Sequence, residues 1–443
     1  MSARDLLART RASNPLPSGT MTVGVGLMVA GVTSYAFLLL TAHAVGAEQY
    51  ATFFVVWSLI FLGGPGFFLP LEQEVSRALS QRSALGQGSG PLLRRAASLG
   101  AVLAAGLVVV SLIGAPVALD QLFHGQVLLV VALVGGWLGY YAEHLSRGTL
   151  SGLGRFRNYS VLLGAEGVAR LAACIVLLAV GASSAGPYGL AVGFAPFVGV
   201  AVAMRGQRDL TGPGPDAPVS ELSTALGWLL LGSVMAQCLM NGGPIAAQLL
   251  ASDAERSLVG EFAGGVVLAR IPLFLFQAIQ AALLPRLSAL AGSGRLTEFR
   301  RGFRRLLVAV ASLGVVGTLA AATIGPWALG FLFRGEFDLS HRTLGLLAAG
   351  SALFMLAMAM AQAAIALGGH ARMAVAWVAA VVTFVMTTIL GDDLLLRVEL
   401  GLLFGSAVGA GGMALVVFSR IREGAVVQAG DFLEALHEVP FET

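Results

Sequence analysis

The run TMTVGVGLMVAGVTSYAFLLLTAHAV, residues 20–45, contains 26 residues and no Asp, Glu, Lys or Arg. A helix that crosses the hydrocarbon core of a bilayer needs about 20 predominantly apolar residues. The run is also longer than the core of a secretory signal peptide, and no clear cleavage site follows it. It therefore predicts a permanent transmembrane helix.

The rest of the chain repeats this pattern. Of the 443 residues, 57% are hydrophobic and 12% are charged, and the mean hydropathy is +0.83. Soluble domains carry about 25% charged residues, so this composition excludes a water-soluble fold. The apolar runs are continuous rather than alternating, which favours helices over a β-barrel. We expect an all-α polytopic membrane protein of about twelve transmembrane helices in two six-helix lobes.

Hydropathy and turn residues place the expected helices along the chain. They cover residues 20–45, 50–76, 96–117, 126–146, 158–180, 185–204, 222–249, 258–285, 306–332, 341–366, 372–390 and 397–419. The most polar stretch, 205–221, contains TGPGPDAP at 211–218. We therefore predict an N-terminal lobe (1–204), a cytoplasmic linker (205–221), a C-terminal lobe (222–419) and a cytoplasmic tail (420–443).

The basic residues follow this topology. All 27 are arginines, and arginine is enriched in loops on the cytoplasmic side of a membrane. One set of alternate loops, with the tail, holds Arg77, Arg82, Arg94, Arg95, Arg147, Arg155, Arg157, Arg205, Arg208, Arg286, Arg295, Arg300, Arg301, Arg304, Arg305, Arg372, Arg420 and Arg422. The other set holds Arg256, Arg334, Arg342 and Arg397. This alternation predicts that both termini are cytoplasmic. It accounts for the net charge of +3 without a nucleic-acid partner.

Other features exclude several function classes. Cys174 and Cys238 both lie in apolar runs, so we expect no disulfide, metal site or cofactor. The chain has no dinucleotide-binding, zinc-protease or P-loop motif, which argues against an enzyme. The segment TEFRRGFRRLL, 297–307, places two phenylalanines beside four arginines. It predicts an interfacial helix at anionic headgroups, or a positive-inside anchor without lipid specificity.

Three charges fall deep inside expected helices, where charge is costly. Glu166 and Arg170 are four residues apart on one face, in the favourable order for an intrahelical pair. The pair either pins helices together or lines a cavity in which Arg170 binds phosphate or Glu166 carries a proton. Arg270 has no acidic neighbour at helical spacing, which predicts either a phosphate ligand or a salt bridge to another helix, with Glu166 as one partner.

Polar side chains also gather on single helix faces. They line either a central aqueous cavity or interhelical hydrogen bonds. The cavity candidates are Gln237 and Asn241 (with Ser233 and Gln248), Arg270 with Gln277, and Gln362 with Ser351. Glu143, His144, Arg147 and Arg77 are candidates for a cytoplasmic entrance, or for an interfacial polar cap. Prolines at 65, 70, 244, 272 and 285 predict helix breaks or kinks.

Three turns resemble those of a known transporter family. They read GAEQYATF (46–53) with GPGFFLPLEQEVSR (64–77), GTLSGLGRFRNY (148–159) and ALGGHAR (366–372). They are similar to turns in the polysaccharide-flippase branch of the multidrug/oligosaccharidyl-lipid/polysaccharide exporter superfamily. The resemblance covers most of the chain in length, helix count and loop pattern.

The resemblance implies a V-shaped bundle of six plus six helices in the bacterial inner membrane. Such a protein moves a polyprenyl-phosphate-linked glycan between leaflets by alternating access, with membrane lipids and, in some systems, glycosyltransferases or a polymerase as partners. Two alternatives stay open. One is a cation-coupled multidrug antiporter, which needs a carboxylate without a basic neighbour. The other is a membrane-embedded glycan-assembly enzyme, which the short expected outer loops disfavour.

Overall fold

A computed structural model describes residues 20–208, 210–218, 221–222, 225–273, 276 and 295–423. In this part of the chain every regular element is a helix. The helices are α2 (Thr20–Ala84), α3 (Gly90–Gln121), α4 (Val127–Gly152), α5 (Phe156–Ala179), α6 (Ala185–Met204), α7 (Leu226–Leu250), η2 (Asp253–Glu255), α8 (Arg256–Ala269), α10 (Leu296–Leu332), α11 (His341–Ala366), α12 (His370–Leu390) and α13 (Leu394–Arg422). Ten of them are long and apolar enough to span a membrane.

The first of these ten is two helices rather than one. Gly46 has φ 72° and ψ 171°, a conformation that interrupts α2 and that only glycine adopts readily. Beyond this kink the chain turns back, because the ring of Phe37 lies 5.8 Å from that of Phe53 and 6.0 Å from that of Trp57. The predicted helices 20–45 and 50–76 are therefore the two arms of a hairpin.

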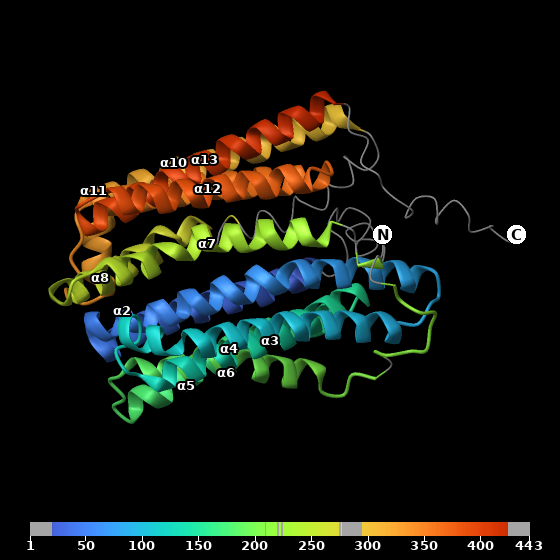
Figure 1. Cartoon of the computed structure of the whole chain (residues 1–443), viewed down its shortest axis with the longest axis horizontal. Coiled ribbons are helices and arrows are strands. Elements are labelled where there is room, and N and C mark those ends of the chain that lie inside the picture. The colour runs from blue at the N-terminus through green and yellow to red at the C-terminus, as the bar shows by residue number, and fades with distance from the viewer. Residues whose placement is uncertain are drawn as a thin grey trace, which may run out of the picture.

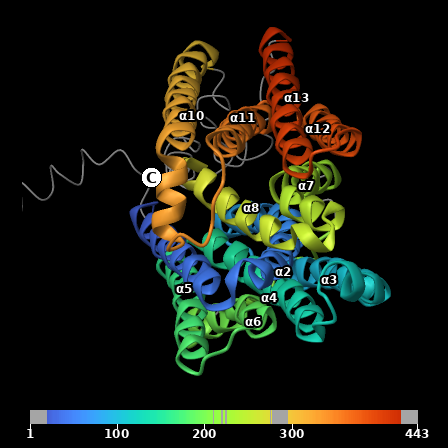
Figure 2. The same ribbon diagram turned by 90° about the vertical axis from the view of Figure 1, so that its left-hand side faces the viewer.

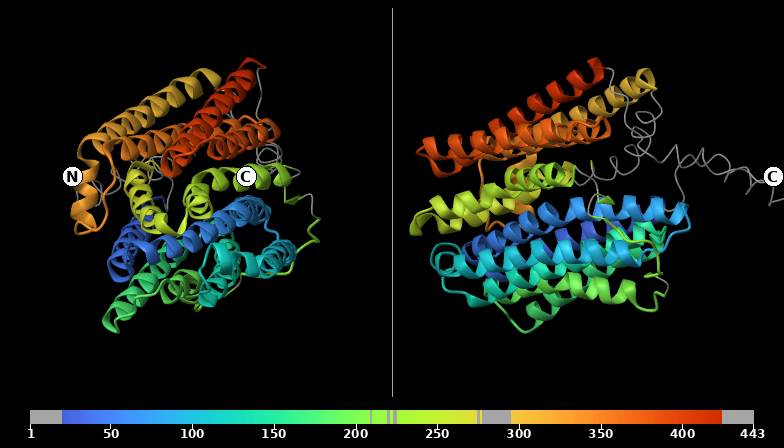
Figure 3. Two further views of the ribbon diagram at one scale, coloured as in Figure 1. Left: turned by 60° about the vertical axis from the view of Figure 1, so that its left-hand side comes forward. Right: turned by 45° about the vertical axis from the view of Figure 1, so that its right-hand side comes forward.

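The helices form two lobes, as predicted. Figures 1 and 2 show α2 to α6 on one side, α10 to α13 on the other, and α7 and α8 between them. The direct contacts between the lobes run mainly from α2 to α7 and α8. The same separation is visible from both directions in Figure 3. Whether the boundaries 1–204 and 222–419 delimit independent folding units stays a prediction.

The bundle has two distinct ends. We call the end where α2 begins and α13 ends the arginine end, because the loops α2–α3, α4–α5 and α6–α7 lie there. The opposite end, at the kink of Gly46, is the kink end, and it holds Arg256, Arg334, Arg342 and Arg397. The two predicted sets of loops thus fall on opposite ends of the described structure.

The kink end joins the two lobes in one large hydrophobic core, whereas nearer the arginine end a smaller described cluster joins them, in which Leu222 packs with Leu71 and Val75 of α2. At the kink end Tyr50 of the first lobe stacks near Phe333 and Phe337 of the second, with ring centroids 6.4 and 5.8 Å away, and all three belong to one buried cluster with Phe262 and Leu394. Toward the arginine end, the buried cluster around Phe303 and Trp377 draws only on the second lobe. Among the described residues, the lobes are therefore closed together at the kink end.

The segment predicted as an interfacial helix is part of α10. This helix runs without a break for 37 residues from Leu296, and Phe299 and Phe303 are buried against the second lobe. The prediction was wrong because the apolar face that it assigned to lipid packs on protein. The four arginines at 300, 301, 304 and 305 are exposed. A helix of this length exceeds the hydrocarbon thickness of about 30 Å, so its first turns project beyond it.

The linker between the lobes is fastened to the first lobe. Arg82, which is 3% exposed, donates to both carboxylate oxygens of Glu221, at 2.5 and 2.8 Å, and to the carbonyls of Gly88, Pro215 and Asp216. Since a guanidinium carries five N–H donors, one side chain holds three points of the linker.

Candidate functional site

The largest group of buried charges lies where α2, α4 and α5 meet. Gly148 and Gly152 of α4 face α2 so closely that a Cβ at either position would lie 2.7 to 2.8 Å from a backbone oxygen of α2. Small residues four apart allow this approach. It brings His144 and Arg147, one turn earlier on α4, within reach of Glu72 on α2.

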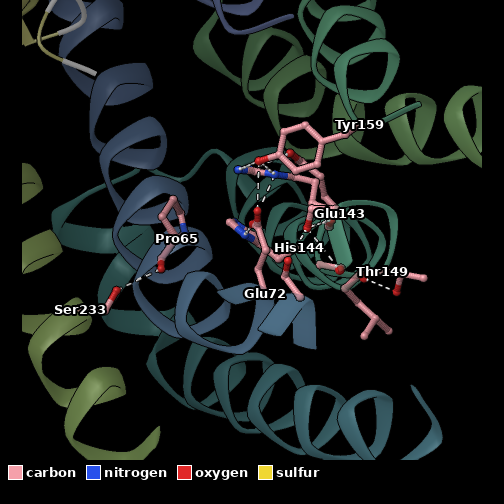
Figure 4. Close-up of polar contacts among 12 residues, drawn as sticks. Pro65, Glu72, Glu143, His144, Thr149, Tyr159 and Ser233 are labelled. Atoms are coloured by element: carbon pink, nitrogen blue, oxygen red, sulfur yellow. Dashed lines mark hydrogen bonds and ion pairs between the residues drawn. The ribbon is translucent and has the colours of Figure 1, made fainter. Parts of the chain in front are cut away.

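Five polar side chains converge there, and we call them the α2–α4–α5 cluster: Glu72, Glu143, His144, Arg147 and Tyr159. Figure 4 labels all of them except Arg147. His144 Nδ1 lies 2.6 Å from Glu72 Oε2. Arg147 Nε lies 3.3 Å from the same oxygen, and its Nη1 donates to Glu143 Oε1 at 3.3 Å. The Tyr159 hydroxyl accepts from Arg147 Nη2 at 2.9 Å and donates to Glu72 Oε1 at 3.1 Å.

The cluster is closed to solvent in this conformation. Glu143, His144 and Glu72 are 1%, 2% and 6% exposed. Three of the four residues predicted for an entrance are therefore within or beside the protein core, where their charges pair with one another. The fourth, Arg77, is half-exposed and bonds instead to Glu74 and to the linker carbonyl of Glu221.

Two atoms of the cluster lack a partner. Glu143 Oε2 and His144 Nε2 are both buried, and neither makes a hydrogen bond. Buried polar atoms are nearly always bonded, so these two unpartnered atoms are unusual, as is Arg170 Nε in the neighbouring ion pair.

Glu166 and Arg170 form the predicted intrahelical pair on α5. Arg170 Nη2 donates to Glu166 Oε1, which also accepts from the Tyr140 hydroxyl at 3.1 Å. Arg170 Nη1 donates to Ser34 at 3.0 Å. Both charges are buried, at 5% and 3% exposure, inside the first lobe. In this conformation the pair ties α5 to α2 and α4, and a phosphate role for Arg170 stays a prediction that requires the site to open.

The prediction of a continuous helix over 258–285 was wrong around Arg270. Helix α8 ends at Ala269, and Arg270 is its C-terminal capping residue. The cause is Pro272, whose ring clashes with the preceding turn and whose missing N–H breaks the hydrogen-bond ladder. The break, predicted from the prolines, sets the guanidinium between α8 and α7.

A second proline, on α7, leaves a backbone carbonyl free for Arg270. Pro244 has no N–H to donate to the carbonyl of Met240, four residues earlier. Arg270 Nη2 donates to that carbonyl instead. No described carboxylate pairs with Arg270, and Glu166, the partner considered from the sequence, bonds to Arg170. The guanidinium borders a cavity of about 30 Å³ with Ser351 and Ser406, which has room for about one water.

Arg270 also lies close to the boundary between the lobes. Tyr35 of α2 interacts electrostatically with it, and the Tyr35 hydroxyl donates to the carbonyl of Val267 at 3.3 Å. The polar face of α7 lies on the same boundary. Ser233 donates to the carbonyl of Pro65 at 3.3 Å (Figure 4), and the side chain of Gln237 packs beside Gly66.

The remaining candidates are spread over the second lobe. Asn241 is buried and donates to Gln237 at 2.9 Å on the same helix. Gln248 is buried with its oxygen unpartnered, and Gln362 is half-buried on α11. Gln277 lies outside the described residues.

Glu399 was missed by the sequence analysis. It is fully buried on α13, and neither carboxylate oxygen has a hydrogen-bond partner. Thr343 of α11 and the charges of Arg342 and Asp393 act on it. The acidic residue lies five positions after the start of α13, so that hydropathy alone places it at a loop edge rather than in the core.

No family model matches this sequence. An uncharacterized protein of Mycobacterium tuberculosis is 26% identical over 420 residues, which cover 91% of this chain and 93% of the relative. An uncharacterized protein of Mycobacterium bovis is 26% identical over 420 residues, covering 90% of this chain and 92% of the relative. These relatives match nearly the whole chain, and their names state no activity.

Solved structures show which fold this is. An inward-facing multidrug resistance MATE family transporter of the MOP superfamily superposes with a TM-score of 0.71, at 12% identity, over 94% of this chain and 100% of that chain. The chain has the MATE fold. An outward-facing MATE transporter gives a TM-score of 0.67 at 13% identity, over 93% and 96% of the chains. A mutant of the Vibrio cholerae MATE transporter VcmN gives 0.62 at 17% identity, over 92% and 99%. The predicted MATE-like, two-lobed fold is thus confirmed.

Proposed function

We propose that this protein transports a polyprenyl-(pyro)phosphate-linked oligosaccharide from the inner to the outer leaflet by alternating access. The MATE fold supports a transporter, because its solved examples include inward-facing and outward-facing conformations. Most of the core that the lobes share lies at the kink end. This arrangement fits a carrier that is closed at one end.

The position of Arg270 supports an anionic, phosphate-bearing substrate. Arg270 is a cation at the boundary of the two lobes, in contact with α7 and close to α2, and no described carboxylate neutralises it. Charge in this position is costly and typical of a substrate pathway. A guanidinium also matches the planar geometry of phosphate oxygens. An anionic lipid-linked substrate therefore fits better than a cationic drug.

The arginines indicate the orientation of the protein in the membrane. We assign the arginine end to the cytoplasm, because arginine-rich loops stay on that side. The closed kink end then faces outward, and the conformation is inward-facing. Glycosyltransferases and a polymerase would act before and after this step, at opposite faces of the membrane.

A cation-coupled multidrug antiporter is the second candidate, and Glu399 favours it. An unpaired buried carboxylate is costly unless it binds a proton or another cation. Glu399 is the kind of group that such an antiporter requires, although it faces α11 rather than the lobe boundary. Glu399→Gln should abolish resistance to organic cations if this candidate is right, and should leave glycan export unaffected under the leading proposal.

Substitutions of Arg270 test whether it binds the phosphate of the substrate or only bonds to the carbonyl of Met240. We expect Arg270→Ala to abolish glycan export at a near-normal protein level, and Arg270→Lys to restore it only in part, because lysine lacks the planar fork. Loss of the protein from the membrane would instead indicate that Arg270 is needed to satisfy Met240.

A double variant provides the control. Arg270→Ala combined with Pro244→Ala removes the cation but restores a backbone N–H at position 244, which can bond to the carbonyl of Met240. Under the proposal this variant is stable and still inactive. Recovery of glycan export in the double variant would overturn the ligand role.

A further inference from the structure

We propose that the α2–α4–α5 cluster is a binding site for one exchangeable proton, held by His144 or by Glu143. The site lies in the first lobe, apart from Arg270, and no substrate is needed to define it. Its use as the coupling site of transport rests on the proposed function above, whereas its existence does not.

Charge balance carries the argument. Without a bound proton, two carboxylates, Glu72 and Glu143, face one guanidinium, Arg147, and a neutral imidazole, His144. The cluster would then hold one uncompensated negative charge in a core where the side chains of Glu72, Glu143, His144 and Arg147 are at most 16% exposed. Burying such a charge is costly. One added proton makes the cluster neutral.

The surroundings offer no other compensation. On α2, Glu74 is already paired with Arg77 at 3.0 Å. From α5 only the hydroxyl of Tyr159 reaches the cluster. From α4, Tyr140 directs its hydroxyl to Glu166, whose charge is balanced by Arg170. Among the described contacts, a proton is thus the missing positive charge.

The geometry favours a proton over a metal ion. Arg147 lies between the two carboxylates and bonds to both, in the position that a bridging cation would need. In the described part of the chain, no three His, Cys, Asp or Glu side chains are arranged to hold a metal. A proton needs only one lone pair.

The atoms without a hydrogen-bond partner indicate where that proton binds. Glu143 Oε2 and His144 Nε2 are the two unpartnered buried atoms of the cluster, and they belong to adjacent residues of α4. A proton on the imidazole leaves Nδ1–H to donate to Glu72 at 2.6 Å. A proton on Glu143 leaves Oε1 to accept from Arg147. Either form balances the charge, so either residue can hold the proton while the hydrogen bonds to Glu72 and Arg147 stay in place.

Thermal unfolding measured against pH tests the site directly. A thiol-reactive dye reports unfolding through Cys174 and Cys238, which are buried and partly buried. Because the folded cluster holds a proton that the unfolded chain releases, stability is present at low pH and lost as pH rises. A one-proton difference changes the unfolding equilibrium about tenfold per pH unit. We expect this loss to begin as the pH rises above about 6.5, the ordinary pKa of a histidine in an unfolded chain.

Charge-neutral variants show whether the proton is in the cluster. Glu143→Gln removes the charge that the proton balances, so its pH slope should fall by one proton relative to the wild type. Glu72→Gln removes the same charge and serves if the first variant does not fold. Asp120→Asn, on the exposed end of α3, is the matched control and should keep the wild-type slope.

Equal slopes in the wild type and in both glutamine variants would overturn the proposal. Coupling is tested separately, in vesicles that carry a pH gradient. Glu143→Gln should lose stimulation by the gradient, whereas Asp120→Asn should keep it. If wild-type vesicles move no glycan while the melting slopes differ as expected, the proton site stands and the proposed substrate is wrong.

Discussion

Gly260 offers a direct way to shift the equilibrium between conformations. It lies on α8 at the kink end, where the lobes touch, and a Cβ added there would be 1.9 Å from the carbonyl oxygen of Ala47 on α2. Real Cβ atoms stay at least 3.0 Å from such a neighbour. The lobes must therefore separate by about 1.1 Å, the difference between these two distances, since the obstacle is backbone and cannot rotate away.

The energies can be weighed against each other. Overpacking of this kind costs about 1–3 kcal/mol, whereas glycine to alanine within a helix gains about 0.5–1 kcal/mol. The gain applies to every conformation, and the clash applies only to the closed kink end. Gly260→Ala should therefore disfavour that conformation by the whole cost of the clash, about 1–3 kcal/mol, which is a factor of about 5–150 in the population ratio.

Spin-label distances can measure this shift. Val180 and Leu390 are 72% and 78% exposed at the kink ends of α5 and α12, one in each lobe. Labels at these two positions, with Cys174 and Cys238 replaced by alanine, report the lobe separation. The variant should gain a longer-distance population that the parent lacks.

The matched control is Gly106→Ala on α3, where an added Cβ meets nothing within 4 Å. It should raise stability slightly without altering the distances. A folded Gly260→Ala protein with an unchanged distance distribution would refute the interpretation of this contact as the closed gate.

Three further predictions concern single contacts. Glu166→Gln or Arg170→Met alone should destabilise the protein by about 3–5 kcal/mol, because each leaves the other residue as an unpaired buried charge. The double variant should recover most of the melting temperature. If Arg170 binds phosphate, the double variant should still export no glycan. Arg82→Ala should release the linker and speed tryptic cleavage within it, while the cleavage rate of the wild type and of an Arg82→Lys variant should stay lower. Burial and, after it, the charge of Arg256 lower the pKa of His124. The neutral imidazole therefore stabilises the closed kink end at pH values above about 6.5, the ordinary pKa of histidine, and this stability is lost as the pH falls. The spin-label pair should therefore separate on acidification, and His124→Asn should show no such response.

The sequence predicted the spans well where apolar runs end in clear polar turns. Residues 185–204 and 341–366 match α6 and α11 at both ends. The errors share a cause, which is that hydropathy does not report what a helix packs against. Helix α10 begins at Leu296 rather than at residue 306 because its first aromatic residues are buried in protein.

The candidate sites divide in the same way. The pairing of Glu166 with Arg170 is local, so a four-residue spacing was enough to predict it. The joining of Glu72 to His144 spans 72 positions and depends on how closely α4 approaches α2, which no single segment encodes. Glu399 was missed because its burial comes from the neighbouring helices.

The central claim is that the protein moves a lipid-linked glycan across the membrane. The most direct measurement reconstitutes the purified protein in vesicles that contain a fluorescent polyprenyl-pyrophosphate-linked oligosaccharide in both leaflets, and then adds a glycan-cleaving enzyme that cannot cross the membrane. The account predicts that cleavage proceeds beyond the outer-leaflet fraction with the wild type, and stops at that fraction with Arg270→Ala and in protein-free vesicles. Cleavage that stops at the outer-leaflet fraction with folded wild-type protein would contradict it.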